Sequence, residues 1–286
     1  MRDLNYHHLR YFHEVAREGH LGRTADRLNV SQSALSIQLR ALEDRIGHKL
    51  FDRVGRGLEL TEVGEIAKSY SEQIFGAGAE LQATLARFGA ERIPLRVGAL
   101  STLSRNFQIA FLRPVLVSGN ASLQLRSGSI SVLLEALKEL SLDVVLTTEL
   151  PPEGFQAHAI ATQEIGLHGH KDRLMHSTLE DLLAKEPLIL PTDRAIRPRF
   201  DGLMSRLEIQ PKIVAEVDDM AMVRLLAREN AGVAVAPAVV LADEIANQRL
   251  ATAPFALDIV EPFYAVTTPR SFPHPALAEL IVPATD

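Results

Sequence analysis

The chain contains no cysteine, and this absence removes several kinds of chemistry at once. Disulfide bonds, thiolate metal sites, cysteine nucleophiles and thiol-based redox sensing are all excluded. The sequence also lacks any apolar run near the roughly 18 residues that a membrane-spanning helix needs, and its start lacks the apolar stretch of a signal peptide. We therefore expect a cytoplasmic protein without a membrane partner.

Positive charge is scarce as well. The formal net charge of −6 argues at first against a nucleic-acid partner. Along the chain, however, residues 1–60 hold ten Lys and Arg against eight Asp and Glu, whereas residues 61–91 hold two against five and residues 92–286 hold eighteen against twenty-three. Only the first segment is positive, so any DNA binding would depend on a few well-placed arginines and on two copies acting together.

What is present begins with a helical pattern after Ser31. Apolar residues recur there at i, i+4, i+7 and i+11, which predicts a helix with one face buried. Ser31 is a good N-cap for it and Gly47 a good stop. The buried stripe is Leu35, Leu39, Leu42 and Ile46, and the opposite face is expected to expose Ser33, Ile37, Arg40 and Asp44, with Ser36 at its flank.

A shorter helix precedes this one, with Ala25 and Leu28 directed inward and Asn29-Val30 forming the turn. A first helix is predicted from about Tyr6 to Arg17, ended by Gly19. A short helix that supports a second helix with small polar residues at its exposed start is typical of a helix-turn-helix that enters the major groove of DNA. From periodicity alone, an ordinary helical hairpin stays open as the alternative.

Residues 48–61 then predict a strand, a glycine-containing turn and a second strand, which together form a small wing. Its turn is expected to present Arg53 and Arg56 to DNA phosphates, although solvated surface arginines would have the same pattern. No helix start follows Gly55-Arg56-Gly57, so this turn does not indicate a nucleotide-binding loop.

A long helix is predicted from the cap at Thr61 to about Phe88. At about 27 residues it would be about 40 Å long, more than a small winged domain can cover. We therefore expect homodimerisation through its apolar stripe. The stripe consists of Ile66, Tyr70, Ile74, Ala77, Leu81 and Leu85.

Strands and helices alternate in the rest of the chain, which predicts βαβ units with a parallel sheet. The expected strands are 95–100, 122–126, 142–146, 164–169, 188–191, 212–216, 232–236 and 262–267. The expected helices are 102–117 with Pro114 as a kink or stop, 129–140, 178–184, 195–207, 219–229, 238–247 and 275–280.

These features together resemble LysR-type transcriptional regulators over essentially the whole chain. The resemblance is carried by residues 25–47, by Leu50-Phe51-Asp52-Arg53 and Arg56, and by Leu60-Thr61-Glu62-Val63-Gly64. Within the family, residues 5–12 and 55–59 look most like the activator of a sodium/proton antiporter, which makes sodium or pH a candidate signal.

The resemblance implies a winged helix-turn-helix at residues 1–60, a linker and dimerisation helix at 61–91, and an effector domain at 92–286. That domain would have two lobes like those of periplasmic binding proteins, about 92–148 with 267–286 and about 149–266. Such regulators form homodimers and tetramers on double-stranded promoter DNA, act with RNA polymerase, and respond to a small molecule or ion between the lobes. No cofactor and no enzymatic activity are expected.

The family's DNA contacts fall on the start of the second helix and on the wing. Ile37 departs from the family, since many relatives carry Arg or another polar residue there. An apolar side chain can contact a thymine methyl but cannot bind guanine through two hydrogen bonds. The predicted DNA-binding residues are Thr24, Ser31, Gln32, Ser33, Ser36, Ile37, Arg40, Arg53 and Arg56.

In this architecture, effectors bind at the carboxyl ends of strands and near helix N-termini. Hydroxyls and free amides there suit an anion such as a carboxylate, although they serve equally well as plain helix caps. The candidates are Ser101, Thr102, Ser127, Gly128, Ser129, Thr147, Pro191, Thr192, Ala236 and Pro237.

We predict no metal site and no catalytic group. Glu164, His168, His170 and His176 are the one cluster suggestive of metal, but their place at a strand end explains them too. Asp218-Asp219 precedes a helix and indicates a cap. The rival interpretations are an α/β enzyme or solute-binding module with an attached DNA-binding head, and an architectural protein that needs no ligand.

Overall fold

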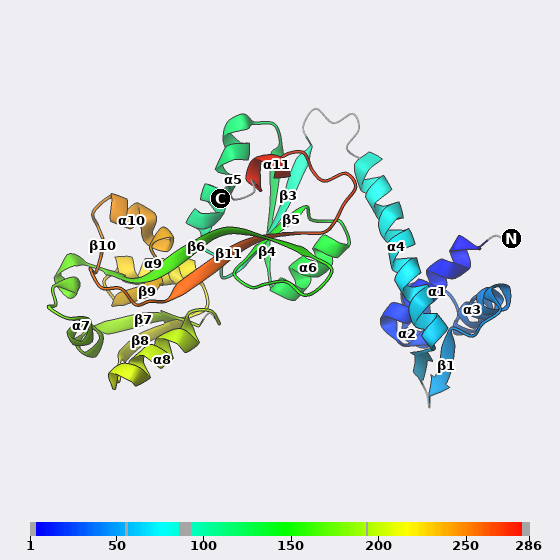
Figure 1. Cartoon of the computed structure of the whole chain (residues 1–286), viewed down its shortest axis with the longest axis horizontal. Coiled ribbons are helices and arrows are strands. Elements are labelled where there is room, and N and C mark those ends of the chain that lie inside the picture. The colour runs from blue at the N-terminus through cyan, green and yellow to red at the C-terminus, as the bar shows by residue number, and fades with distance from the viewer. Residues whose placement is uncertain (1–3, 55–56, 86–92, 193, 282–286) are drawn as a thin grey trace. The chain divides into compact units, whose positions relative to one another are not determined.

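The computed structural model describes residues 4–54, 57–85, 93–192 and 194–281, and the chain divides into two compact units, residues 1–88 and 89–286. The first unit, which we call the head, is the helix-turn-helix with its wing and long helix (Figure 1). Its elements are α1 (Tyr6–Glu18), α2 (Leu21–Arg27), α3 (Gln32–Ile46), the strands β1 (Phe51–Val54) and β2 (Gly57–Leu60), and α4 (Glu62–Leu85).

The helix boundaries in the head follow from its caps. The Ser31 Oγ atom accepts a hydrogen bond from the Ala34 amide at 3.1 Å, and Gly47 ends α3 with a φ of 84°, a left-handed conformation that suits glycine. Leu35 and Leu42 are fully buried and pack with Phe12 of α1, as the spacing predicted. The helix-turn-helix is therefore confirmed, and the plain helical hairpin is excluded by the three-helix core and the wing.

Strands β1 and β2 pair antiparallel, which confirms the wing. Helix α4 begins where Thr61 caps it, with the Thr61 Oγ1 atom accepting from the Gly64 amide at 2.9 Å. The predicted end of α4 at Phe88 lies outside the described residues. One residue of the predicted stripe does not stay free for a partner chain. Ile74 packs against the core of the head, where α4 contacts α1.

At Gly64, the backbone of α4 lies close against the backbone of the segment before the wing. A Cβ atom there would overlap the backbone carbonyl oxygen of Leu50, whereas one at Gly78, farther along the same helix, would meet nothing within 4 Å. We expect Gly64→Ala to lower the free energy of unfolding of the head by about 1–3 kcal/mol, and Gly78→Ala to raise it by about 0.5–1 kcal/mol. Calorimetry of the two variants checks this; equal effects would contradict the close approach.

The second unit is a two-lobed α/β domain. Its strands are β3 (Pro94–Leu100), β4 (Ser122–Gly128), β5 (Val144–Thr147), β6 (Gln156–Gly169), β7 (Pro187–Pro191), β8 (Lys212–Val217), β9 (Val233–Pro237), β10 (Ala251–Thr252) and β11 (Val260–Thr267). Its helices are α5 (Arg105–Ser118), α6 (Ile130–Lys138), α7 (Leu179–Lys185), α8 (Arg197–Leu207), α9 (Met220–Arg228), α10 (Ala242–Ala246) and α11 (Leu277–Leu280), with short 3₁₀ turns η1 (Lys171–Leu174) and η2 (Ala238–Leu241).

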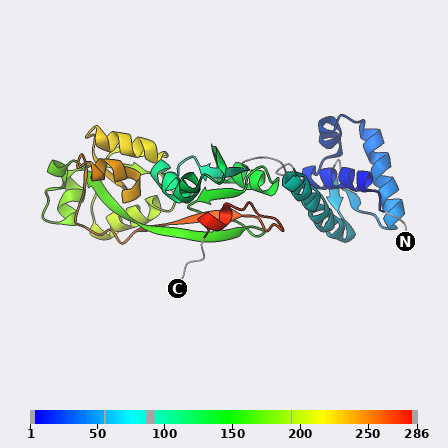
Figure 2. The same ribbon diagram turned by 90° about the horizontal axis from the view of Figure 1, so that it is seen from above.

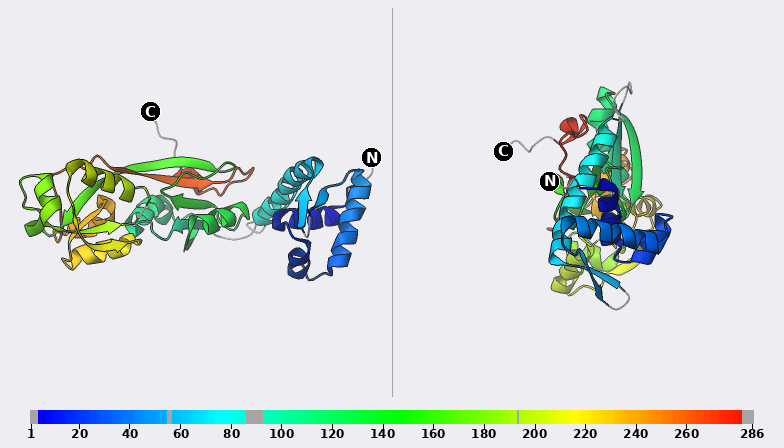
Figure 3. Two further views of the ribbon diagram at one scale, coloured as in Figure 1. Left: turned by 90° about the horizontal axis from the view of Figure 1, so that it is seen from below. Right: turned by 90° about the vertical axis from the view of Figure 1, so that its right-hand side faces the viewer.

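Two long strands join the lobes. Strands β6 and β11 pair antiparallel along their length and run together from one lobe into the other (Figures 2 and 3). On the side of lobe I the strand order continues β5-β3-β4 with parallel pairs around β3, and on the side of lobe II it continues β9-β7-β8 with parallel pairs around β7. Each lobe has its own buried core.

The lobe boundary differs from the predicted one at 148/149 and 266/267. Residues up to Ala161 on β6, and from Phe263 on β11, pack with the core of lobe I, while Ile165 packs with that of lobe II. The reason is that the crossover consists of regular strands instead of loops, so β6 begins at Gln156 and not at Glu164.

Two helix predictions need correction. Helix α5 begins at Arg105 after a Ser104 cap, and it continues through Pro114 to Ser118, so this exposed proline does not stop the helix. The segment 238–247 is a 3₁₀ turn followed by the short α10.

None of the helices in the described ranges combines the length and the apolarity needed to cross a bilayer.

Candidate nucleic-acid interface and pocket between the lobes

The outward face of α3 is small and polar at its start, with one apolar side chain. Ser33 and Arg40 are exposed, Ser36 is half-buried, and the Ile37 side chain is 62% exposed although it lies in a helix with a buried apolar stripe. Gln32 is exposed at the first turn. The structure thus brings these predicted residues together on one solvent-facing surface, which we call the α3 face.

Two of the predicted DNA-binding residues, Ser31 and Thr24, have hydrogen bonds within the fold of the head. The Ser31 hydroxyl caps α3 and lies 3.0 Å from the Ser33 hydroxyl, so it supports the start of the α3 face. Thr24 is fully buried, and its Oγ1 atom donates to the His20 carbonyl oxygen at 3.0 Å within α2. The Thr24 side chain therefore does not reach the α3 face, because its hydroxyl satisfies the backbone of its own helix.

The basic residues of the head are divided between ion pairs and free surface. Arg23 pairs with Glu18 at 3.1 Å and Arg27 pairs with Glu14 at 2.7 Å. Arg40, by contrast, is exposed and forms no ion pair with any residue in the described part of the chain. Arg40 is therefore an arginine of the α3 face that is available for a phosphate.

The wing arginines are located only in part. Arg53 lies in β1 opposite Leu58, one pair from the end of the hairpin, and Arg56 lies outside the described residues. The structure places the backbone of Arg53 near the hairpin end, where the sequence predicted it.

A small pocket lies between the two lobes. Lobe I supplies the loop between β3 and α5 together with Thr148, lobe II supplies Met220 at the start of α9 and Val240 of η2, and the crossover strand β11 supplies two residues. Its lining is Thr102, Leu103, Ser104, Thr148, Met220, Val240, Glu261 and Phe263.

Of the predicted effector residues, only Thr102 lines this pocket. Its neighbours in lobe I lie at the end of β3 and β4, where the Ser101 amide donates to the Gly128 carbonyl oxygen at 3.1 Å. There the exposed Ser127 hydroxyl accepts from the Arg105 Nη1 atom at 3.0 Å. Ser129 is exposed at the N-cap of α6 without a capping hydrogen bond, 3.3 Å from the Ser131 hydroxyl.

The remaining candidates mainly support the fold. The buried Thr147 Oγ1 atom accepts from the Glu149 amide, and the Thr192 amide donates to the Val217 carbonyl oxygen. Pro191, Ala236 and Pro237 are buried in strands of lobe II.

Sequence reasoning missed Ser104, Thr148 and Glu261. The available signal for Glu261 was a single acidic residue within an otherwise uncharged strand, 260–267. Its position at the pocket depends on the crossover, which local patterns do not reveal.

The histidine and acid clusters are explained by hydrogen bonds of the fold. His168 is buried between Thr252 Oγ1 and the Ala236 carbonyl oxygen, both at 2.9 Å, and burial lowers its pKa although the bond to Ala236 opposes that shift. His176 lies 3.0 Å from Glu186. Asp219 caps α9 by accepting from the Ala221 amide. Over the described ranges, no group of three or more His, Asp or Glu is arranged to hold a metal ion.

Comparison with known proteins agrees with this division of the chain. Residues 6–65 match the bacterial regulatory helix-turn-helix protein family, lysR type, and residues 89–282 match the LysR substrate binding domain. The chain belongs to the LysR family of transcriptional regulators. As a member, it combines a DNA-binding head with an effector-binding domain, as the resemblance implied.

Full-length relatives extend the match. The transcriptional activator protein NhaR of Escherichia coli (strain K12) is 26% identical, covering 98% of this chain and 95% of the relative. The regulator ClcR of Pseudomonas putida is 30% identical, covering 82% and 83%. Among solved structures, CbnR is 25% identical with a TM-score of 0.54 over 97% of this chain and 98% of CbnR. CbnR complexed with its target DNA has the same fold, at 24% identity and a TM-score of 0.51, covering 97% of each chain.

Proposed function

We propose that this LysR-type regulator reads promoter DNA with the α3 face and activates transcription when a small effector binds between its lobes. The observation that carries the proposal is the α3 face itself: exposed Ser33, Ile37 and Arg40 beside a half-buried Ser36, on a helix held by a three-helix core. Small side chains at a helix start let the backbone approach base edges, and Arg40 and the wing arginines are assigned to phosphates. The solved CbnR complex with its target DNA and the name of NhaR support DNA binding and activation.

We further propose that the chain works as a homodimer that assembles into a tetramer. In α4, Val63, Ala67, Ile74 and Phe75 pack on the core of the three-helix domain, whereas Ile66, Tyr70, Leu81 and Leu85 are between 53% and 63% exposed. In the second unit, α5 exposes a second apolar group, Ile109, Leu116 and Val117. Two separate apolar surfaces allow pairing through α4 and a further contact between effector domains.

The α4 contact is tested with a fragment of residues 1–91. We expect it to sediment as a dimer, and Tyr70→Asp to weaken the dimer by at least about 10-fold, because a charge replaces an aromatic contact. Tyr6→Asp is the matched control, since Tyr6 is equally exposed but lies on α1. A wild-type fragment that stays monomeric at high micromolar concentration rules out this interface.

The effector acts by changing the angle between the lobes. The pocket has walls from both lobes, so a bound molecule that contacts both would favour one relative position of the lobes. In a tetramer that change alters the spacing of the heads on DNA, and contact with RNA polymerase follows from the new spacing. Such a regulator works in the cytoplasm and has no catalytic step.

A genome-wide pull-down of DNA with the full-length protein tests the function as a whole. We expect recovery of a few promoter sites, with binding that stays sequence-specific at moderate salt and falls steeply as salt increases. Turnover of a bound compound together with little DNA affinity would instead favour an α/β enzyme that carries an incidental head.

A further inference from the structure

The His20 side chain caps α2, and this contact fixes the state of its ring. The His20 Nδ1 atom accepts a hydrogen bond from the Arg23 amide at 3.3 Å. Because a backbone amide can only donate, Nδ1 carries no hydrogen, and the proton of the neutral imidazole lies on Nε2. The cap therefore leaves one N–H group of the ring, at Nε2, directed away from the Arg23 amide.

The ring also lies beside the first turn of α3. Gly22 has no side chain, and a Cβ atom there would lie 3.2 Å from His20 Cε1 and 3.8 Å from Gln32 Oε1. The His20 ring and the Gln32 amide are therefore both within 4 Å of one point above α2. Both residues are exposed. His20 thus adds a hydrogen-bond donor at the border of the α3 face, next to a residue predicted to contact DNA.

The other polar groups around His20 are occupied within the head. The His20 carbonyl oxygen accepts from the Thr24 amide at 3.1 Å and from the Thr24 hydroxyl at 3.0 Å. The Arg23 side chain pairs with the Glu18 carboxylate at 3.1 Å. Within the described ranges, by contrast, no protein group accepts from His20 Nε2. This N–H group is held in a fixed position and is available to a partner outside the chain.

We propose that His20 donates from Nε2 to a phosphate oxygen of the DNA backbone beside the base pair that Gln32 contacts. His20 lies outside α3, at the border of its exposed face, and the phosphates border the groove that a recognition helix enters. The ring binds in its neutral form, because a proton on Nδ1 would break the cap. The inference rests on the proposed function, since it adds a contact to the surface that reads DNA.

Replacing His20 with serine separates the DNA contact from the cap. Serine is a strong N-cap, so α2 keeps its capping hydrogen bond, but the hydroxyl does not extend to the position of Nε2. We expect His20→Ser to weaken binding of the full-length protein to an operator fragment by at least about 5-fold in fluorescence anisotropy at pH 8, because each bound head loses one hydrogen bond. The melting temperature of the head should stay the same.

His7→Ser is the matched control. His7 is exposed on α1, where its ring packs edge-on against Tyr11, and its replacement should leave the affinity at the wild-type value. Salt dependence tests the charge of the contact. A neutral donor releases no counterion, so His20→Ser should keep the wild-type slope of log affinity against log salt, whereas Arg40→Gln should reduce this slope by about 1 for each bound head. Base preferences in selection from randomised DNA should also stay unchanged in His20→Ser.

Unchanged affinity of His20→Ser overturns the inference, as does an equal loss in His7→Ser. A salt slope reduced as in Arg40→Gln, or a new base preference, also contradicts a neutral contact with phosphate. If His20→Ser lowers the melting temperature, His20→Asn takes its place with the same expected results, since asparagine is an equally strong N-cap and its amide is shorter than the imidazole ring. No operator binding by the wild type would refute the proposed function, whereas operator binding that these variants leave unchanged would refute only the His20 contact.

Discussion

Replacing Ser33 with glutamate is expected to weaken binding of the full-length protein to its operator DNA by at least about 100-fold, or about 2.7 kcal/mol. Ser33 is exposed on the α3 face at the second position of the helix. If this face enters the major groove, a carboxylate there meets the negative potential of the DNA, and such like-charge contacts cost several kcal/mol. Fluorescence anisotropy with a promoter fragment from the pull-down measures the change.

The same substitution should leave the head folded. Ser31 caps α3, so position 33 lies in the first turn, where the helix dipole favours a negative side chain. We therefore expect the melting temperature of the head to stay the same or rise slightly. Ser177→Glu is the matched control, because it adds the same charge at an exposed position of the effector domain. Equal affinity of wild type and Ser33→Glu would show that the α3 face does not contact DNA.

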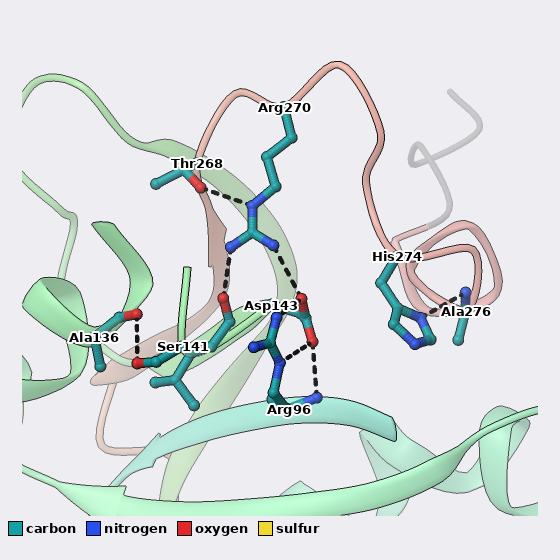
Figure 4. A network of polar contacts seen from close by, with 9 residues as sticks. Arg96, Ala136, Ser141, Asp143, Thr268, Arg270, His274 and Ala276 are labelled. Atoms are coloured by element: carbon teal, nitrogen blue, oxygen red, sulfur yellow. Dashed lines mark hydrogen bonds and ion pairs between the residues drawn. The ribbon is translucent and has the colours of Figure 1, made fainter. Parts of the chain in front are cut away.

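Replacing Asp143 with alanine is expected to lower the free energy of unfolding of the effector domain by about 3–5 kcal/mol. Asp143 is buried immediately before β5 and joins segments far apart in the chain (Figure 4). Its Oδ1 atom accepts from Arg96 Nη2 at 2.8 Å and from Arg270 Nη1 at 2.9 Å, and its Oδ2 atom accepts from the backbone amide and the Nε atom of Arg96, both at 3.0 Å. Without the carboxylate, the buried Arg270 loses a charged partner at 2.9 Å.

The pKa of Asp143 determines how its contribution to the free energy of unfolding of the effector domain changes with pH. Burial alone would raise this pKa, but the hydrogen bonds and charges of Arg96, with the charge of Arg270, hold it below the ordinary value. Because the folded pKa is depressed, the stabilisation is complete above the pKa of the unfolded chain, about 3.9, and is lost as the pH falls below it.

Chemical denaturation of Asp143→Ala at neutral pH checks the size of the effect. Asp201→Ala is the control, since Asp201 pairs with Arg197 at the surface with its side chain 54% exposed. Its loss should change stability by no more than about 0.5 kcal/mol. If the two variants lose the same small amount, the Asp143 network does not stabilise the domain.

The head was predictable because its signals are local. Ser31 and Gly47 bracket α3, and the 3.6-residue period decides that Leu35 is buried and Ile37 exposed, because residues two positions apart point to opposite sides of a helix. The prediction for Thr24 was the one in the head that failed. Periodicity does not show whether its hydroxyl faces solvent or donates to the His20 carbonyl oxygen, as it does in the structure.

The effector pocket was predictable only in part because it is built across long separations. Thr102 follows directly from the rule that ligands bind after a strand end. Glu261 reaches the same pocket only because β11 pairs with β6 about a hundred positions earlier in the chain, and no local pattern specifies that register. The pairing of Asp143 with Arg270 is hidden for the same reason.

The most direct test of the account is the base preference of the wild-type protein and of Ile37→Arg, measured by selection from randomised operator DNA. Ile37 is the apolar side chain of the α3 face, so we expect the wild type to prefer thymine at one position of each half-site and Ile37→Arg to prefer guanine there, by about 1–3 kcal/mol. All other positions should keep their preferences. An unchanged preference at every position, or a uniform loss of affinity without a new preference, would contradict reading of DNA by this face.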